Sequence, residues 1–244
     1  MNKIYNQWHG QQTKFFGMPD SVYLSGIMVV NMSETHSLVS NWVSELRNVN
    51  VQNDRMRFRR NLERIGETIS YEISKVLPYK MLEVETPLGT HHSMVLDTQP
   101  VVASILRAGV PMHTGILNYF DKADNAFISA FRKHHKDGSF EIKLEYLSCP
   151  PLEDRILIVA DPMIATGASL VASIQALLNH GGPAQVHIVC AIACTIGLEY
   201  VEKNLGSQVS IWCGDIDDEL TAKSYIVPGL GDAGDLAFGS KKQN

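Results

Sequence analysis

Short apolar runs alternate with helical patterns through the C-terminal two thirds of the chain. After Pro87, apolar stretches occur at 101–106, 126–131, 155–160, 186–193 and 209–213, and loops of glycine or small residues separate them from helical patterns at 110–120, 169–180 and 196–204. Parallel strands need a crossover connection, which a helix usually supplies. The order therefore predicts a doubly wound α/β domain with a mainly parallel sheet and flanking helices.

Two amphipathic helices are expected before this sheet. Ser33 is a candidate N-cap for the first helix. The apolar series are Leu38, Trp42, Val43 and Leu46, and then Phe58, Leu62, Ile65, Ile69 and Ile73. Residues 27–30 are interpreted as a short edge strand or as an arm on a partner subunit, within an N-terminal arm at 1–32.

A hairpin is expected between the second and third runs. Lys136-Asp137-Gly138 lies between two short stretches of mixed polarity, and Asp-Gly favours a tight turn. We expect a two-stranded flap at 132–150 beside the sheet. With no internal repeat or long linker visible, the whole chain, 1–244, is predicted to be a single domain.

Composition restricts the possible partners. The formal net charge of −5 provides no global positive field for nucleic acid or an anionic membrane, so any phosphate binding must be local. The four cysteines form no CxxC pair and are expected to be reduced thiols. The N-terminus lacks an apolar leader segment, and no apolar run is long enough to span a membrane. We expect a cytoplasmic protein.

A loop of small residues follows the third apolar run. It reads Asp161-Pro162-Met163-Ile164-Ala165-Thr166-Gly167-Ala168-Ser169 and leads into a helical pattern. Such a loop presents N–H groups and hydroxyls to an anion at the positive end of a helix, at the edge of the sheet where ligands bind. An ordinary strand-to-helix turn capped by Asp161 explains the loop equally well. The loop has neither the lysine of a P-loop nor GxGxxG, so a sugar phosphate fits better than a triphosphate or NAD.

Two further segments carry possible chemistry. The run at 225–235, Tyr-Ile-Val-Pro-Gly-Leu-Gly-Asp-Ala-Gly-Asp, holds three glycines, and its backbone can approach a flat ligand closely. Arg107 directly follows the first apolar run, and its planar fork suits a pyrophosphate. Taken alone, the first segment favours a solvated glycine turn, and Arg107 is equally well explained as a surface arginine.

These segments together resemble a known family. The strand, the acid and Ala-Thr-Gly-x-Ser resemble the phosphoribosyl pyrophosphate (PRPP) loop of type I phosphoribosyltransferases. Asp161-Pro162-Met163 resembles the variant found in the uracil-specific members, where proline replaces a second acid. The 225–235 run is similar, almost residue for residue, to the base-recognition loop of uracil phosphoribosyltransferases. Weaker likenesses at 83–89, Asp217 and Leu220 extend the resemblance from about residue 55 to residue 239.

The resemblance implies a reaction and a set of site residues. Uracil and PRPP would give UMP and diphosphate, with a base-recognition hood at 215–239. The implied catalytic residues are Asp161, Arg107, Arg132 and Asp232. The implied PRPP contacts are Arg107, Arg132, Asp161, Pro162, Met163, Ile164, Ala165, Thr166, Gly167, Ala168, Ser169 and Asp232. The implied uracil contacts are Ile226, Gly231, Asp232 and Ala233.

Further expectations concern metals and partners. Mg²⁺ should arrive with the diphosphate substrate. No resident metal site is expected, because neighbouring histidines such as His91 and His92 point to opposite sides of a strand. The flap departs from the family pattern, reading Leu147-Ser-Cys-Pro-Pro151 where relatives commonly have Lys-Leu-Pro. The two amphipathic helices and the unassigned arm before the sheet predict a homodimer or homotetramer. By resemblance, GTP binding is a property of some members.

Two alternative functions remain open. One is a related phosphoribosyltransferase with a different base specificity. The other is a pyrimidine-sensing regulator that keeps the fold but binds RNA, although such a protein needs a basic face. The arginines at 55, 57, 59, 60 and 64 are interpreted as a solvated helix face or a subunit contact rather than as an RNA site.

Overall fold

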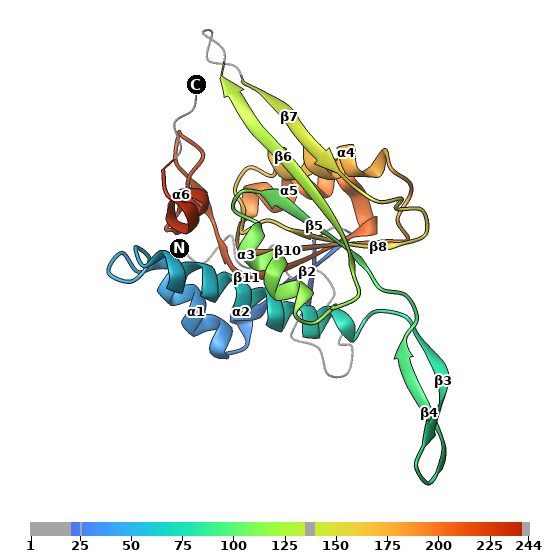
Figure 1. The fold of residues 1–244 in the computed structure, drawn as a ribbon. Helices are drawn as coiled ribbons and strands as arrows, with labels where there is room; N and C mark the ends of the chain where they lie inside the picture. Colours follow the sequence, from blue (N-terminus) through green and yellow to red (C-terminus); the bar gives the residue numbers. More distant parts are fainter. Residues whose placement is uncertain (1–20, 25, 135–139, 241–244) are drawn as a thin grey trace.

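A nine-stranded sheet forms the centre of the computed structural model, which describes residues 21–24, 26–134 and 140–240 (Figure 1). The strands are β1 (Ser21–Leu24), β2 (Ile27–Asn31), β5 (Val101–Leu106), β6 (Asp124–His134), β7 (Phe140–Ser148), β8 (Ile156–Ala160), β9 (Met163–Ile164), β10 (Gln185–Cys194) and β11 (Val209–Asp217). The path runs β1-β2-β11-β10-β8-β5-β6-β7, and β9 pairs with β10. Every pair from β2 across to β6 is parallel, while β1 and β7 pair antiparallel at the two ends. The predicted, mainly parallel α/β sheet is confirmed.

Helices cover both faces of the sheet (Figure 1). On one face lie α1 (Leu38–Arg47), α2 (Arg55–Ser74) and α3 (Val110–Leu117), and on the other lie α4 (Ala168–Leu178) and α5 (Thr195–Leu205). The short helix α6 (Ala233–Phe238) packs near α2, and two 3₁₀ turns occupy Met32–Glu34 and Gly206–Gln208. Among the described helices, none combines the length and hydropathy needed to span a bilayer.

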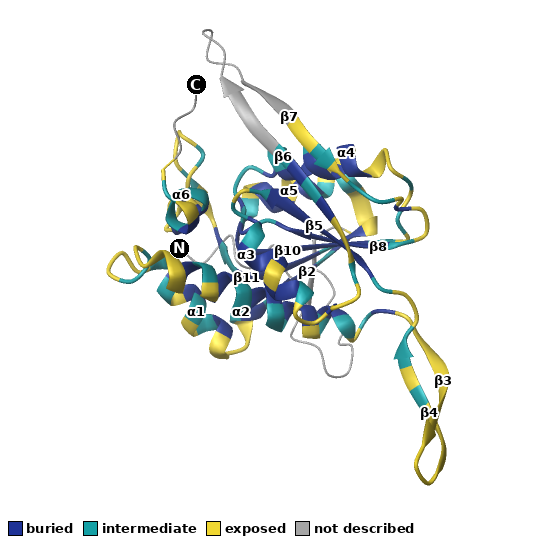
Figure 2. Ribbon diagram, viewed as in Figure 1, coloured by how far each residue is buried: buried dark blue, intermediate teal, exposed yellow. Residues whose placement is uncertain are grey.

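The central strands are buried on both sides, which explains their continuous apolar sequences (Figure 2). Side chains of a strand alternate between the two faces of the sheet. Val102 and Ile158 accordingly join the core under α1, α2 and α3, whereas Ala103 and Leu157 join the core under α4 and α5. The sheet therefore separates two apolar clusters.

Both predicted N-terminal helices are present, but the first begins later than expected. The entire apolar series of α2, from Phe58 to Ile73, is buried. Ser37, not Ser33, caps α1 by accepting a hydrogen bond from the Val39 N–H at 3.2 Å. The Ser33 hydroxyl instead donates to Asp215 Oδ1 at 2.8 Å, so a tertiary contact takes the hydroxyl that the sequence assigned to the cap.

Residues 27–30 belong to the sheet of this protomer. They lie in β2, which pairs with β11 in parallel, and β1 pairs with β2 on its outer side. The edge-strand interpretation is thus correct in type, although β2 is one position in from the edge. Residues 1–20 of the predicted arm lie outside the described residues.

Two hairpins project from the body (Figure 1). Strands β6 and β7 pair antiparallel where the flap was predicted, and its turn at 136–138 lies outside the described residues. The second hairpin, β3 (Tyr79–Thr86) with β4 (Gly89–Leu96), was not predicted. Every residue of β3 is exposed, so the core gives this hairpin little support (Figure 2).

Candidate active site

A cavity of about 370 Å³ lies at the carboxyl ends of β5 and β8. Ligands of open α/β sheets bind at this edge, because loops there diverge from the sheet. The cavity is lined by Ile105, Leu106, Arg107, Ala108, Asp161, Pro162, Met163, Ile164, Ala165, Thr166, Gly167, Ser169, Leu170, Lys223, Ser224, Tyr225, Ile226, Asp232, Ala233 and Gly234. The small-residue loop and the glycine-rich loop therefore line the same cavity.

Asp161 directly follows β8 at the inner end of the cavity. Its backbone N–H donates to the Val189 carbonyl at 3.1 Å, which continues the strand ladder and fixes the residue. Burial raises the pKa of Asp161 to about 7, and a hydrogen bond from the Met163 N–H acts in the opposite direction. At pH 7 this carboxyl is close to half protonated, and a positive charge placed beside it favours the carboxylate.

The loop after Asp161 is held tightly at the start of α4. Gly167 adopts a left-handed conformation with φ of 76°, which L side chains rarely adopt, and Thr166 Oγ1 accepts a hydrogen bond from the Ala168 N–H at 3.4 Å. Behind the loop, a Cβ added to Gly197 of α5 would overlap the carbonyl oxygen of Ala165. The loop is thus pressed onto α5, with its N–H groups at the positive end of a helix.

Arg107 lies at the opening, where β5 ends. The Leu106–Arg107 peptide bond is cis. Its guanidinium donates from Nη2 to Asp235 Oδ1 and to the Gly239 carbonyl, each at 3.3 Å. The side chain is 41% exposed. Arg107 is therefore accessible to an anion in the cavity and already contacts the C-terminal loop.

The glycine-rich loop has its own hydrogen-bonded frame. Strand β12 (Glu219–Leu220) pairs antiparallel with β13 (Ile226–Val227), and the Thr221 N–H donates to the Tyr225 carbonyl at 2.8 Å. Asp232 caps α6 by accepting a hydrogen bond from the Asp235 N–H at 2.9 Å. Ile226 and Ala233 are buried, so the backbone between them is fixed on both sides.

Most of the predicted site residues come together, with three exceptions. Ala168 and Gly231 are not among the lining residues of the cavity, although their neighbours are. Arg132 lies in β6 opposite Ile142, and the placement of its side chain lies outside what the structure describes. The roles assigned to the predicted residues stay predictions.

Sequence reasoning did not single out Lys223 and Ser224, which also line the cavity. They sit directly before the glycine-rich run, so extending that motif by two residues toward the N-terminus would have included them. Ala108 and Gly234 were likewise not selected. Ala108 directly follows Arg107, and Gly234 directly follows Ala233, so proximity to selected residues was the signal for both.

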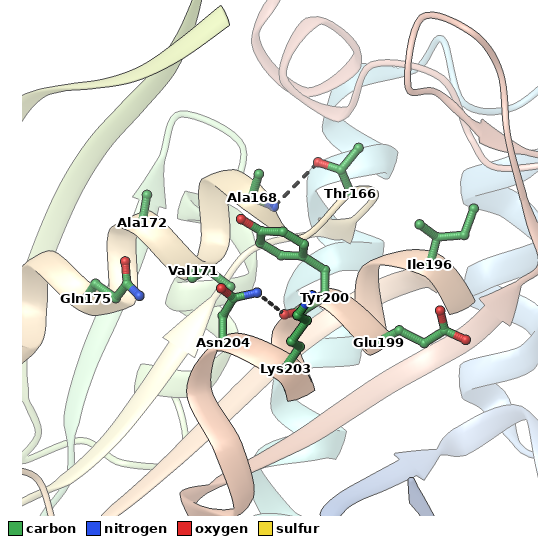
Figure 3. Close-up of a pocket in the computed structure, with 10 residues that line it drawn as sticks. All are labelled: Thr166, Ala168, Val171, Ala172, Gln175, Ile196, Glu199, Tyr200, Lys203 and Asn204. Atoms are coloured by element: carbon green, nitrogen blue, oxygen red, sulfur yellow. Dashed lines mark hydrogen bonds between the residues drawn. The ribbon is translucent and has the colours of Figure 1, made fainter. Parts of the chain in front are cut away.

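A second hollow of about 610 Å³ lies between α4 and α5 (Figure 3). Its lining residues are Thr166, Ala168, Val171, Ala172, Gln175, Ile196, Glu199, Tyr200, Lys203 and Asn204. Thr166 borders both hollows, so this groove runs along the outer side of the small-residue loop. In it, the Asn204 amide donates to the Tyr200 carbonyl at 2.7 Å.

The cavity contains few groups that could hold a metal. Asp161 and Asp232 contribute carboxylates, which are hard oxygen ligands of the kind that magnesium prefers. Within the described ranges, no cluster of three or more histidine, cysteine, aspartate or glutamate side chains is arranged to bind a metal ion. This donor set fits a magnesium ion that a phosphorylated substrate also ligates.

Comparison with known proteins identifies the family. A family model for uracil phosphoribosyltransferase matches residues 32–240. The uracil phosphoribosyltransferase of Porphyromonas gingivalis is 46% identical over 213 residues, which cover 87% of this chain and 99% of that protein. The uracil phosphoribosyltransferase of Methanothermobacter thermautotrophicus is 38% identical over 188 residues, covering 76% of this chain and 85% of that protein.

A solved structure agrees with this similarity. A protein from Aquifex aeolicus superposes with a TM-score of 0.77 at 31% identity, covering 87% of this chain and 98% of that chain. The sequence match spans both the small-residue loop and the glycine-rich loop that line the cavity. The chain belongs to the uracil phosphoribosyltransferase family.

Proposed function

We propose that this protein transfers the phosphoribosyl group of PRPP to uracil, giving UMP and diphosphate in pyrimidine salvage. One observation carries the proposal: the small-residue loop after Asp161 and the glycine-rich loop from Tyr225 line the same cavity. The first loop suits a sugar phosphate and the second suits a planar base. Their meeting brings the two reactants to one place, which can supply a large part of the rate enhancement.

The sugar phosphate lies along the first loop in this proposal. The loop N–H groups and the hydroxyls of Thr166 and Ser169 bind the 5′-phosphate at the start of α4. Asp161 holds the ribose hydroxyls. Because its pKa is raised, a positive charge beside it favours the carboxylate, which gives its proton to water and then stabilises the charge that develops on the ribose.

The diphosphate leaves past Arg107. Arg107 is accessible at the cavity mouth, and Arg132 of the flap is the second arginine assigned to this task. Asp161 and Asp232, the two carboxylates of the cavity, would hold a magnesium ion that arrives with PRPP. When bound, it supplies positive charge that neutralises the departing diphosphate.

Uracil lies against the second loop. Backbone groups of Ile226, Gly231 and Ala233 read the polar edge of the ring, and Asp232, which lines the cavity, faces the sugar diphosphate. A ring nitrogen forms the new bond to the anomeric carbon while the bond from that carbon to the diphosphate oxygen breaks. The electron pair leaves with diphosphate, and the proton of the ring nitrogen passes to the departing diphosphate. Cytosine is rejected because its exocyclic amine places a donor against a donor.

A panel of bases tests the substrate assignment. Wild type and Arg107→Ala are assayed with PRPP, Mg²⁺ and radiolabelled uracil, cytosine, orotate, hypoxanthine or xanthine. We expect kcat/KM for uracil to exceed that for the other bases by about a hundredfold or more. In the variant, the KM for PRPP should rise by about tenfold or more.

Two outcomes would contradict the proposal. Faster conversion of orotate, hypoxanthine or xanthine would make the protein a phosphoribosyltransferase of another specificity. An absence of turnover with every base, together with RNA binding that weakens steeply with salt, would make it a regulator.

We also propose that the chain acts as a single domain, 1–244, in a homodimer or homotetramer. The exposed β3–β4 hairpin supports assembly, because an isolated two-stranded hairpin is at best marginally stable in water. Met81 and Met94 are direct cross-strand partners, and they are 66% and 64% exposed. A partner subunit that covers them would remove an exposed apolar patch.

We place the reaction in the cytoplasm. All four cysteines are free thiols, and Cys190, Cys194 and Cys213 are buried. Unpaired thiols are typical of a reducing compartment, and PRPP is a phosphorylated metabolite of that compartment.

A further inference from the structure

Three charged side chains outside the cavity meet behind the glycine-rich loop. Arg47 ends α1, while Asp215 and Asp217 lie at the carboxyl end of β11. We call these residues the Arg47 cluster. None of its members is among the described residues that line the cavity. The mechanism proposed above assigns no function to these three residues.

The cluster is densely hydrogen-bonded. Arg47 binds Asp217 with both guanidinium arms, from Nη1 to Oδ2 at 2.7 Å and from Nη2 to Oδ1 at 2.9 Å. Nη2 also donates to Asp215 Oδ2 at 2.7 Å. A bidentate pair of this kind fixes orientation as well as distance.

The same pair holds both polar groups of one residue in the loop. Arg47 Nη1 donates to the Gly229 carbonyl at 3.1 Å, and the Gly229 N–H donates to Asp217 Oδ2 at 3.0 Å. The next residue is tied to α1 as well, because Gln52 Nε2 donates to the carbonyls of Leu46 and Leu230 at 2.9 and 3.3 Å. The loop is thus anchored to the C-terminal end of α1.

Gly229 is the turning point of the loop. It has φ of 58°, and a Cβ there would overlap the carbonyl oxygen of Ile226. It lies three positions after Ile226 and three positions before Asp232, and both of these residues line the cavity. The orientation of the Gly229 peptide therefore sets how the two sides of the base site face each other.

Burial makes the cluster sensitive to substitution. The side chains of Arg47 and Asp217 are 18% and 7% exposed, so solvent screens their interaction far less than that of a surface pair. Removal of Arg47 would leave the Asp217 carboxylate buried without its counter-charge. The carboxylate would then compete for other donors, and the Gly229 turn would lose one of its two hydrogen bonds.

We propose that Arg47 is a positioning residue for the base site: acting through Asp217 and Gly229 from outside the cavity, it holds the uracil-recognition turn in its binding geometry. The inference rests on the uracil site proposed above. It assigns a function in base recognition to a residue of the N-terminal helix, far from the loop in sequence. The loop after Asp161, which binds the 5′-phosphate on the other side of the cavity, does not depend on this anchor.

The test separates the two substrates. KM and kcat are measured for uracil at saturating PRPP, and for PRPP at saturating uracil, in wild type, Arg47→Met and Arg47→Lys. We expect Arg47→Met to raise the KM for uracil by about tenfold or more and the KM for PRPP by no more than about twofold. Arg47→Lys keeps the charge but loses the bidentate fork, so its effect on uracil should be intermediate.

Arg57→Gln is the matched control. Arg57 also makes a side-chain ion pair, with Glu45, but it is 49% exposed and does not contact the loop. Its kinetic constants should match those of wild type. Thermal unfolding and PRPP binding measured without uracil report whether each variant is folded.

Three results would overturn the inference. The first is a folded Arg47→Met or Arg47→Lys variant with an unchanged KM for uracil. The second is an equal rise in both KM values. The third is failure of both variants to fold, which would make the cluster a folding determinant. If wild type does not use uracil at all, the proposed function fails instead.

Discussion

The raised pKa of Asp161 lowers the free energy of unfolding near neutral pH. A carboxyl whose folded pKa is raised to about 7 costs the folded protein free energy whenever solvent is less acidic than its unfolded pKa of 3.8. Such a cost at a residue in a cavity is typical of functional sites, where a group is tuned for a ligand rather than for the fold. In the reaction proposed above, the positive charge that develops on the ribose is the ligand charge that offsets this cost.

The sign of this cost gives a prediction for Asp161→Asn. Between pH 3.8 and about 7, the folded chain binds more protons at this site than the unfolded chain, so wild-type stability falls as pH rises through this window. Asparagine does not titrate, and its side-chain oxygen can still accept the hydrogen bond from the Met163 N–H. Relative to wild type, the variant should gain stability from pH 5 to pH 8, by at most about 4 kcal/mol. Its kcat should fall by about a hundredfold or more.

Urea unfolding across this pH range checks the stability difference, and the uracil assay checks the activity. Asp121→Asn is the control, because Asp121 is exposed and lies outside the cavity. Parallel pH profiles for wild type and Asp161→Asn would contradict the prediction.

At the scale of elements, the conformation of the small-residue loop depends on α5, the helix behind it. Gly197 lies in the first turn of α5, and Ala165 of the loop packs directly onto it. Interiors are close-packed, so a shift of one element displaces its neighbour. The position of α5 therefore controls the shape of the small-residue loop, although no described residue of α5 lines the cavity beside Asp161.

Gly197→Ala is expected to damage PRPP binding selectively. The added methyl group overlaps the Ala165 carbonyl and must push the loop toward the cavity. We expect the KM for PRPP to rise by about tenfold, a smaller change for uracil, and a stability loss of about 1–3 kcal/mol. Gly182→Ala is the control, because a Cβ there meets only Glu153 Oε2 at 3.8 Å. Steady-state kinetics with PRPP and uracil varied in turn measure both KM values. Equal changes in the KM for PRPP and the KM for uracil would refute the prediction.

The sequence predicted the helices and strands whose apolar side chains pack in the core. The α2 stripe and the β5 run are buried where the periodicity required. The β3–β4 hairpin escaped prediction because it contacts the core only at its base, through Leu96, and neither face is buried along its length. One face carries Met81 beside Glu83, and the other carries Leu82 beside Lys80. Alternation reveals a strand only when one face is buried.

The site was predictable to the extent that its residues are local in sequence. Each loop has its own motif, and the edge of the sheet at which both end follows from strand direction. The contact of Arg47 with Asp217 joins residues 170 positions apart, and no local pattern announces it. The Ser33 cap failed for the same reason, since its distant partner Asp215 cannot be read from neighbouring residues.

At the scale of the whole molecule, two cores and one unsupported hairpin coexist. The cores on either face of the sheet bury the central strands almost completely. The β3–β4 hairpin extends away from both of them (Figure 1). Its exposed apolar side chains lie on both of its faces, with Met81 and Met94 on one and Leu82 and Val84 on the other. A surface of this kind requires a covering partner, and a second copy of the chain is the one we propose.

Charge placed on this hairpin should therefore break the assembly and leave the fold intact. Met81→Glu with Met94→Glu introduces two carboxylates at a cross-strand pair, where like charges repel and cannot be covered by an apolar partner. Sedimentation equilibrium should give a multiple of 27.1 kDa for wild type and the single-chain mass for the double variant. Met56→Glu is the control, since Met56 is 70% exposed on α2, away from the hairpin, and its mass should match that of wild type. A wild-type mass of one chain would refute the proposed oligomer, whereas an unchanged multiple in the double variant would show that the subunits meet elsewhere.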